Sequence, residues 1–476
     1  MGLIFYDIFL LVLFAIFVSI FLYRKKDNLK QEGILILYKT KWGIKFIDYI
    51  GEKYKKTLNF ISYISIGSGY VLMMGMIFML VQTVYIYLTT SISQVIKIPP
   101  IAPLIPYFPK LFGLQSLFPP FYFIYFIVAL LIVATVHEFS HGIFARKSGI
   151  KIKSTGFAFF KYFPAFFGAF VEQDEQQMEK AKKFDQMSVL SAGVFANVVV
   201  AVLFYVVLFG FFSFAFTASG VTFNEYAYEI LPIMSITSVN GVILNNPTID
   251  EFASHLKENE TFNEIYIGEK SYVGVKEIGV TKLDGQDIYL AGLYYDSPAI
   301  NANLSGVISE INNVNIDSIE KLQEELEKYS PGEEIEIKTI SEEEISVKNV
   351  VLLEHPENED VAWLGIGFYE NSRKGFLGKV LDLFPSYKKA NIYYEPKNDL
   401  SVFIKDFLWW IFVINILVAL FNMLPVGILD GGRFFYLTIL GITGSEKVAK
   451  SGFKIVTQLI LLSFVAITIK WVFGFF

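Results

Sequence analysis

The sequence contains no cysteine, only four histidines, and few charged residues for its length of 476. The absence of cysteine excludes disulfide frameworks, thiolate zinc sites, iron–sulfur clusters and cysteine nucleophiles. Charged residues make up 18% of the chain and apolar residues 54%, with a mean hydropathy of +0.48, whereas soluble domains carry about 25% charged residues. The composition therefore predicts an integral membrane protein and excludes a cytosolic enzyme or a disordered chain.

Acidic charge is concentrated in one part of the chain. Residues 217–400 contain 32 acidic and 14 basic side chains, whereas the remainder contains 14 acidic and 26 basic ones. This stretch has no membrane character and is long enough to hold its own core, so we expect a water-soluble domain. Its negative charge argues against nucleic acid as a partner.

Six apolar runs can each supply the roughly 20 helical residues that span a bilayer. Residues 24–56 carry ten basic and four acidic side chains, which predicts a cytoplasmic loop and places the N-terminus and the acidic domain outside. Residues 97–120 hold seven of the sixteen prolines and are expected to form a rigid outer cap rather than a helix. The six spans are predicted at about residues 3–23, 59–89, 121–148, 188–216, 407–424 and 455–475.

The third span contains the sequence ATVHEFSHGIF, in which His137 and His141 are four residues apart. On a helix both imidazoles lie on one face and can bind one metal ion, while the adjacent Glu138 can act as a general base. Zinc would lower the pKa of a bound water from about 16 to about 7. The alternative is that the three side chains only bond to other helices, but ionisable groups inside a span are costly and usually functional.

A catalytic zinc needs a third protein ligand and an open position. His255 and His355 lie in the acidic region and are expected to be surface residues. Asp430, in FNMLPVGILDGGRFF, follows the fifth span, where Pro425 and Gly427 break the helix so that the carboxylate can turn toward the metal. The alternative is an ordinary interfacial turn in which Asp430 caps a short helix.

These motifs resemble those of the site-2 protease family of intramembrane zinc metalloproteases. H-E-x-x-H in one span and N-x-x-P-x-x-x-L-D-G in a later one, here Asn422 to Gly431, are similar to its two metal-binding motifs. SAGVFAN, with Gly193 and Asn197, is similar to its G-x-x-x-N signature. The resemblance is strong over roughly residues 120–215 and 405–440, and the N-terminal part looks like the archaeal-type members.

The resemblance implies a polytopic α-helical membrane protein with about six transmembrane helices and an extracytoplasmic insertion. Its active site would lie near the cytoplasmic face of the cell membrane. The expected parts are an N-terminal two-helix region with the basic loop and proline-rich cap (1–120), core helices with HExxH (121–216), the acidic outer region (217–400), and the third core helix with a C-terminal helix (401–476).

The resemblance also implies one Zn²⁺ per chain, bound by His137, His141 and Asp430, with Glu138 as general base. Its substrates would be transmembrane-helix proteins in the lipid bilayer, already clipped outside, as in regulated intramembrane proteolysis. A substrate helix would first unwind, and Asn197 and Asn422 would hold the extended strand or the oxyanion through amide donors. Alternatively, these two residues only bond to neighbouring helices.

Two further segments carry weaker patterns. Residues Gly156 to Glu175, broken by Pro164 and Gly168, are too short for two spans and predict a re-entrant hairpin whose edge strand could pair with substrate. The alternative is a surface-lying amphipathic loop. In the outer region, ITSVNGVIL (236–244) and ISEINNVNI (308–316) each precede a helix-like run, which resembles one or two PDZ-like units that would screen substrates.

Two other functions remain open on the sequence. One is a non-catalytic membrane scaffold that keeps the motifs as a structural zinc site, although such a site has no use for Glu138. The other is a different membrane metallopeptidase, such as the prenyl-processing type, which typically uses a glutamate as third ligand. No later span offers that glutamate, so the LDGG sequence argues against this other class of metallopeptidase.

Overall fold

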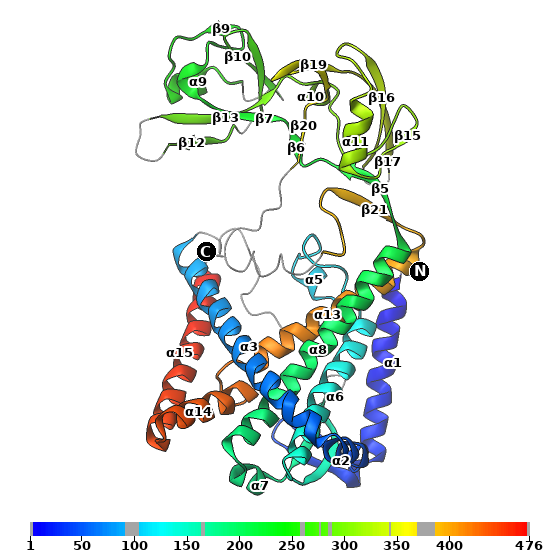
Figure 1. The fold of residues 1–476 in the computed structure, drawn as a ribbon, viewed down its shortest axis with the longest axis vertical. Coiled ribbons are helices and arrows are strands. Elements are labelled where there is room, and N and C mark those ends of the chain that lie inside the picture. The colour runs from blue at the N-terminus through cyan, green and yellow to red at the C-terminus, as the bar shows by residue number, and fades with distance from the viewer. Residues whose placement is uncertain are drawn as a thin grey trace. The chain divides into compact units, whose positions relative to one another are not determined.

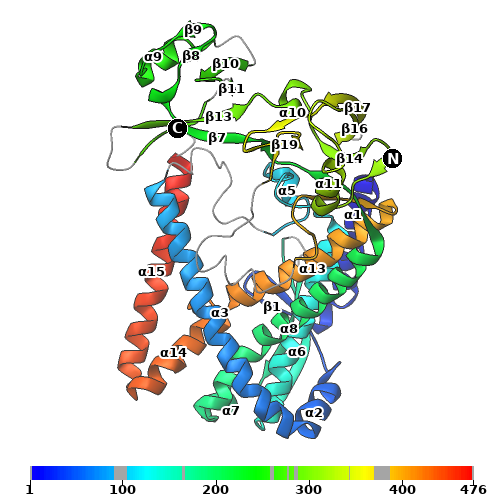
Figure 2. The same ribbon diagram turned by 45° about the horizontal axis from the view of Figure 1, so that its top comes forward.

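The chain folds into two compact units, which are described separately in this computed structural model (Figures 1 and 2). Met1–Phe211 with Val402–Phe476 forms the first, here called the membrane unit, and Phe212–Ser401 forms the second, called the acidic unit. The membrane unit is mainly helical, and the acidic unit is mainly β-structure. The structure describes residues 3–90, 104–162, 167–257, 262–275, 278–283, 288–341, 344–368 and 386–473.

Among the described residues, six helices are long and apolar enough to cross a membrane, which confirms the predicted number of spans. The last two begin earlier than predicted, because polar residues such as Asp399 and Lys450 extend the helices beyond their apolar part. The six are α1 (Leu3–Arg24), α3 (Lys55–Thr89), α6 (Phe123–Lys147), α8 (Lys183–Ala215), α13 (Asp399–Asn422) and α15 (Glu446–Phe473).

Shorter helices connect these spans. The proline-rich segment was predicted to lack helix, yet it contains the single turn α5, in which Pro109 stands in the first turn, where no backbone donor is needed. Residues 97–103 of that segment lie outside the described residues. The short helices are α2 (Ile44–Lys53), α5 (Phe108–Leu111), α7 (Glu175–Lys180) and α14 (Asp430–Thr443).

A four-stranded antiparallel sheet in the membrane unit has the order β1-β2-β3-β4. β3 (Ile152–Phe160) and β4 (Phe167–Gln173) pair antiparallel and form the predicted hairpin. Residues 163–166 lie outside the described residues. The sequence did not predict that β1 (Leu29–Glu32) and β2 (Leu35–Thr40) would extend this hairpin, with Leu35 opposite Phe160. β4 packs on α6. That this hairpin re-enters the membrane stays a prediction.

The start of α6 is fixed by a carboxylate from α1. Asp7 is buried, its Oδ2 accepts hydrogen bonds from the backbone N–H of Phe123 (2.6 Å) and from the Tyr107 hydroxyl (2.5 Å), and its Oδ1 accepts from the N–H of Ile124 (3.0 Å). A helix N-terminus presents unpaired N–H groups and a positive dipole end, so this contact stabilises the helix that carries HExxH.

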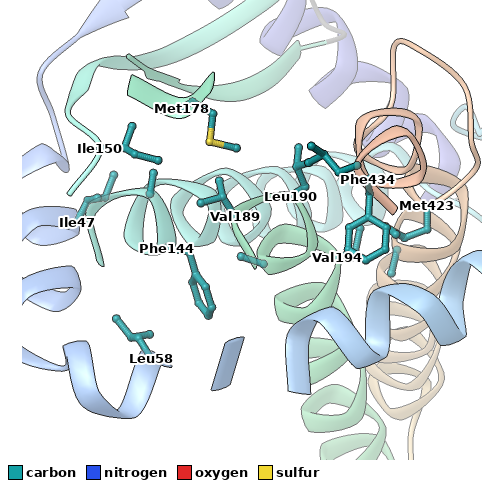
Figure 3. Packing of buried hydrophobic residues seen from close by; sticks show 14 of the residues in the cluster. Ile47, Leu58, Phe144, Ile150, Met178, Val189, Leu190, Val194, Met423 and Phe434 are labelled. Atoms are coloured by element: carbon teal, nitrogen blue, oxygen red, sulfur yellow. The ribbon is translucent and has the colours of Figure 1, made fainter. Parts of the chain in front are cut away.

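One apolar cluster joins the elements on which the sequence motifs lie (Figure 3). Ile47 of α2, Phe144 of α6 and Val189 of α8 are buried in it, together with Met423, which follows α13, and Phe434 of α14. Because protein interiors are closely packed, this cluster holds the four segments in one arrangement.

The acidic unit contains two larger sheets, each with its own apolar core. One sheet has the order β12-β13-β11-β10-β8-β9, with β7 also paired to β13, and the other has the order β17-β16-β14-β5-β21, with β15 also paired to β14. Their strands are β5 (Phe216–Thr222), β7 (Tyr228–Pro232), β8 (Ser238–Val239), β9 (Val242–Ile243), β10 (Phe262–Ile267), β11 (Lys270–Val275), β12 (Val280–Lys282), β13 (Tyr289–Tyr295), β14 (Val307–Ile311), β15 (Val314–Asn315), β16 (Glu334–Ser341), β17 (Glu344–Val351) and β21 (Ile392–Pro396).

Short elements complete this unit. β6 (Glu225–Tyr226) pairs with β20 (Ile366–Gly367), and β18 (Leu353–His355) pairs with β19 (Asn358–Trp363). The helices are α9 (Ile249–Ser254), α10 (Pro298–Asn301) and α11 (Ile319–Leu326).

The two similar sequence segments, residues 236–244 and 308–316, adopt similar structures. β8, β9 and α9 repeat as β14, β15 and α11, and the turn in each copy contains an asparagine with positive φ, Asn240 or Asn312. The Oδ1 of Asn240 accepts from the N–H of Glu264 (3.1 Å), and that of Asn312 accepts from the N–H of Glu336 (2.8 Å). The predicted strand, turn, strand and helix order is therefore present twice. That the copies are PDZ-like units stays a prediction.

Candidate metal centre

His137 and His141 lie on one face of α6, one helical turn apart. No proline or glycine interrupts α6 before Gly142, so the motif stands on continuous helix. The two Nε2 atoms are 3.0 Å apart, and the rings meet edge to face with centroids 4.6 Å apart. Both imidazoles therefore direct the same ring nitrogen at one point.

Asp430 reaches the same point from the first residue of α14. Its Oδ2 is 3.1 Å from Nε2 of His137 and 3.3 Å from Nε2 of His141. After α13 the chain turns back tightly, and the backbone at Gly431 lies close to that at Met423. A Cβ on Gly431 would be only 2.4 Å from the carbonyl oxygen of Met423, so only glycine fits there without a shift. The alternative interpretation of Asp430 as a helix cap is wrong, because the N-cap of α14 is Leu429 and no side chain caps this helix. The Asp430 carboxylate faces the two histidines instead.

These three atoms fit a tetrahedral zinc ion. Ligands at 2.0–2.1 Å from zinc at tetrahedral angles are separated by about 3.3–3.4 Å, and the three observed separations are 3.0, 3.1 and 3.3 Å. Two imidazole nitrogens and one carboxylate oxygen form a donor set suited to catalytic zinc. Within the described residues, these three form the one group of histidine, aspartate or glutamate side chains close enough to share an ion.

α8 supplies the surroundings of the two histidines. The backbone carbonyl of Val189 lies 2.7 Å from Nδ1 of His141, and the side-chain amide of Asn197 lies 3.2 Å from Nδ1 of His137. Between them stands Gly193, where a Cβ would lie 2.5 Å from Nε2 of His141. A side chain at this position would therefore overlap the two histidine rings, which gives the glycine of SAGVFAN a physical reason.

Glu138 and Asn422 flank the histidines. Oε2 of Glu138 accepts a hydrogen bond from the backbone N–H of Val171 in β4 (3.1 Å), which holds the carboxylate beside the sheet edge. Nδ2 of Asn422 is 3.4 Å from Nε2 of His137, so this amide faces the side on which the metal would bind. All six residues singled out in the sequence thus lie in one region of the membrane unit, although Asn197 faces the far nitrogen of His137.

The side chain of Lys147, in the last turn of α6, is buried. Its Nζ donates to Oγ of Ser62 (3.0 Å), to Oγ of Ser188 (3.3 Å) and to Oδ1 of Asp185 (3.3 Å). These hydrogen bonds connect the end of α6 to the first turns of α8, directly before Val189 in the sequence. The signal in the sequence was the i, i+3 spacing of Asp185 and Ser188, which places both on one side of α8.

The site combines two histidines and an aspartate that can hold a metal ion with a glutamate next to one of the histidines. It lies in a unit with six helices long and apolar enough to cross a membrane. These features define the class of membrane metallopeptidases. The chain belongs to peptidase family M50, the site-2 protease family, whose model matches residues 125–467. This match spans more than two thirds of the chain and confirms the resemblance found in the sequence.

The chain is also similar to an uncharacterized protein of Methanocaldococcus jannaschii. The two are 25% identical over 427 residues, which is 88% of this chain and 83% of that protein. The likeness thus extends over both units.

Proposed function

We propose that this protein is a zinc-dependent intramembrane endopeptidase that hydrolyses peptide bonds in or near the transmembrane helices of membrane-anchored proteins. The observation that carries the proposal is the convergence of His137, His141 and Asp430 within a unit of membrane-crossing helices. A substrate that reaches this point must itself lie in the membrane or pass beside it.

Each residue has a distinct role in this proposal. His137, His141 and Asp430 would hold Zn²⁺, which when bound supplies Lewis-acid activation and lowers the pKa of water to about 7. Glu138 accepts the proton of the attacking water and later transfers it to the leaving amine. Nδ2 of Asn422 donates a hydrogen bond to the oxyanion that develops on the scissile carbonyl.

The substrate strand would pair with β4. A peptide bond within a helix is shielded by its own hydrogen bonds, so the substrate has to unwind before attack. In the sheet, β4 is paired with β3 on one side and stands at the end of the strand order, and its Val171 N–H contacts Glu138. An extended segment added along this edge would pass the general base by main-chain hydrogen bonding.

The acidic unit would select substrates rather than contribute to the chemistry. The metal ligands and Glu138 all belong to the membrane unit. The basic loop 24–56 is expected on the cytoplasmic side by the positive-inside rule, and with it the metal centre, whereas the acidic unit would lie outside. There it would screen the outer parts of substrates, by size or by a newly exposed chain end.

A direct experiment uses purified protein and a panel of transmembrane-helix substrates, with and without a zinc chelator. Substrates with a helix-breaking residue near the cut site should be cleaved faster than matched leucine-rich helices, because unwinding costs less. Chelation should abolish cleavage and added zinc should restore it. A non-catalytic scaffold would bind zinc and cleave no member of the panel, and chelator-resistant cleavage would contradict the metal mechanism.

A further inference from the structure

Three residues on one face of α8, Val189, Gly193 and Asn197, are spaced four apart and all face the two histidines. A histidine that binds metal through one ring nitrogen must carry its proton on the other, and a hydrogen-bond acceptor at that second nitrogen fixes the tautomer and the ring orientation. The partners of the two Nδ1 atoms therefore decide whether both Nε2 atoms can bind metal.

For His141 the partner is unambiguous. The carbonyl oxygen of Val189 can only accept, so the 2.7 Å contact requires a proton on Nδ1 and leaves the Nε2 lone pair free. The carbonyl belongs to the backbone of α8, so no substitution of a side chain removes it. His141 is thereby oriented by the position of α8 itself.

For His137 the partner is a side chain that can donate or accept. Nδ1 of His137 lies 3.2 Å from the amide of Asn197, whose nitrogen faces the ring. Asn197 is fully buried, and its Oδ1 has no hydrogen-bond partner among the described residues. Rotating the amide by 180° about its last bond exchanges oxygen and nitrogen and leaves its shape unchanged. The oxygen then accepts from Nδ1–H, and Nε2 of His137 is free toward the metal.

We propose that Asn197 is a positioning residue of the metal centre, whose amide oxygen accepts a hydrogen bond from Nδ1–H of His137 as the Val189 carbonyl does for His141. The inference rests on the proposed metal centre and assigns a role that differs from an oxyanion donor. An oxyanion donor contacts the substrate and affects cleavage alone, whereas a partner of Nδ1 affects metal affinity before any substrate is present.

Gly193 belongs to the same arrangement. It lies midway between the two acceptors, where a Cβ would meet ring atoms of both histidines, at 2.5 Å from His141 and 2.7 Å from His137. Without a side chain at this position, α8 approaches α6 closely enough for both Nδ1 contacts to form. The three residues of V-x-x-x-G-x-x-x-N therefore act together. Val189 and Asn197 orient the two histidine rings, and Gly193 leaves room for them.

The test compares zinc affinity in three variants of the full-length protein in detergent, measured by competition with a chromophoric chelator. Asn197→Leu keeps the size but removes the acceptor and should weaken zinc binding by about 10–100-fold. Asn197→Asp offers an acceptor in either orientation and should bind zinc within a few-fold of wild type. Asn415→Leu is the matched control, because Asn415 is also fully buried but bonds to Ile411 of its own helix.

Each outcome supports or overturns the inference. Loss of affinity in Asn197→Leu alone, with unfolding temperatures of the metal-depleted proteins unchanged, supports it. Wild-type affinity in Asn197→Leu overturns it, and if cleavage is then slow, Asn197 is an oxyanion or substrate residue instead. Equal loss in Asn415→Leu also overturns it, since helix packing would then be the cause. Wild-type protein that binds no zinc would instead contradict the metal centre itself.

Discussion

Polar side chains serve different purposes in the two units of the molecule. In the membrane unit, several buried ones join helices through specific partners, as Asp7 does at the start of α6 and Lys147 does with Asp185. In the acidic unit, most charged residues are exposed and the cores are apolar. A polar residue on an apolar helix is costly and therefore informative, whereas one on a water-exposed sheet carries little information about function.

The largest expected effect concerns the proposed metal ligands of the membrane unit. His141→Ala removes one of three ligand atoms that lie within 3.3 Å of one another, so purified protein should lose most of its zinc, from about one ion per chain. His355→Ala is the matched control, because His355 lies in the acidic unit and accepts from the N–H of Glu357. Metal analysis of both variants checks this, and stoichiometric zinc in His141→Ala would contradict the ligand assignment.

A smaller effect is expected at the buried lysine. Lys147→Met keeps the length of the side chain but leaves Asp185 and Ser62 without their cation, which should lower the free energy of unfolding by ~2 kcal/mol. Lys450→Met is the control, because its pair with Glu446 is exposed and should contribute nothing measurable. Thermal unfolding followed by tryptophan fluorescence distinguishes them, and equal midpoints would mean that the buried network does not stabilise the unit.

Within the acidic unit, loss of the asparagine should destabilise both copies of the asparagine turn. Asn312→Ala and Asn240→Ala each lose a side-chain bond to a strand N–H and place alanine at positive φ, for a cost of about 1–2 kcal/mol. Asn312→Gly loses the bond without the backbone strain and isolates the first contribution. Hydrogen exchange of the Glu336 and Glu264 amides measures both, and a change in one copy alone would argue against equivalent turns.

The smallest expected effect on the metal centre comes from removing the acidic unit. β5 and β21 are paired, with Phe216 opposite Pro396, so a short glycine-serine linker can replace about residues 220–395. Zinc binding should be unchanged, and a bare transmembrane helix should still be cleaved, while a substrate with a bulky folded outer domain should be cleaved more readily. Loss of both activities with zinc retained would show that the acidic unit positions substrate rather than screening it.

The same contrast explains how much could be predicted from the sequence. The six helices follow from hydropathy alone, and His137, His141 and Glu138 follow from a spacing that has meaning only on a helix. Asp430 was predicted because it alone combined a helix break with a carboxylate after a later span. The sequence could locate these residues because local sequence determines helices and because polar groups within them are few.

What the sequence did not reveal depends on contacts between distant segments. The pairing of β2 with β3 joins residues 35–40 to residues 155–160, and no local pattern encodes that register. The burial of Lys147 also depends on contacts with Asp185 and Ser62, which come from other helices. The contact of Asn197 with His137 likewise required the packing of α8 on α6.

One measurement tests the central claim most directly: the zinc content and the cleavage rate of Glu138→Gln in the same preparation. Glutamine keeps the shape of the side chain and can still accept from the Val171 N–H, but it cannot take a proton from water. The variant should retain about one zinc per chain and cleave a transmembrane-helix substrate at least ~10²-fold more slowly than wild type. Cleavage at the wild-type rate with zinc bound would contradict the assignment of Glu138 as the general base of an intramembrane protease.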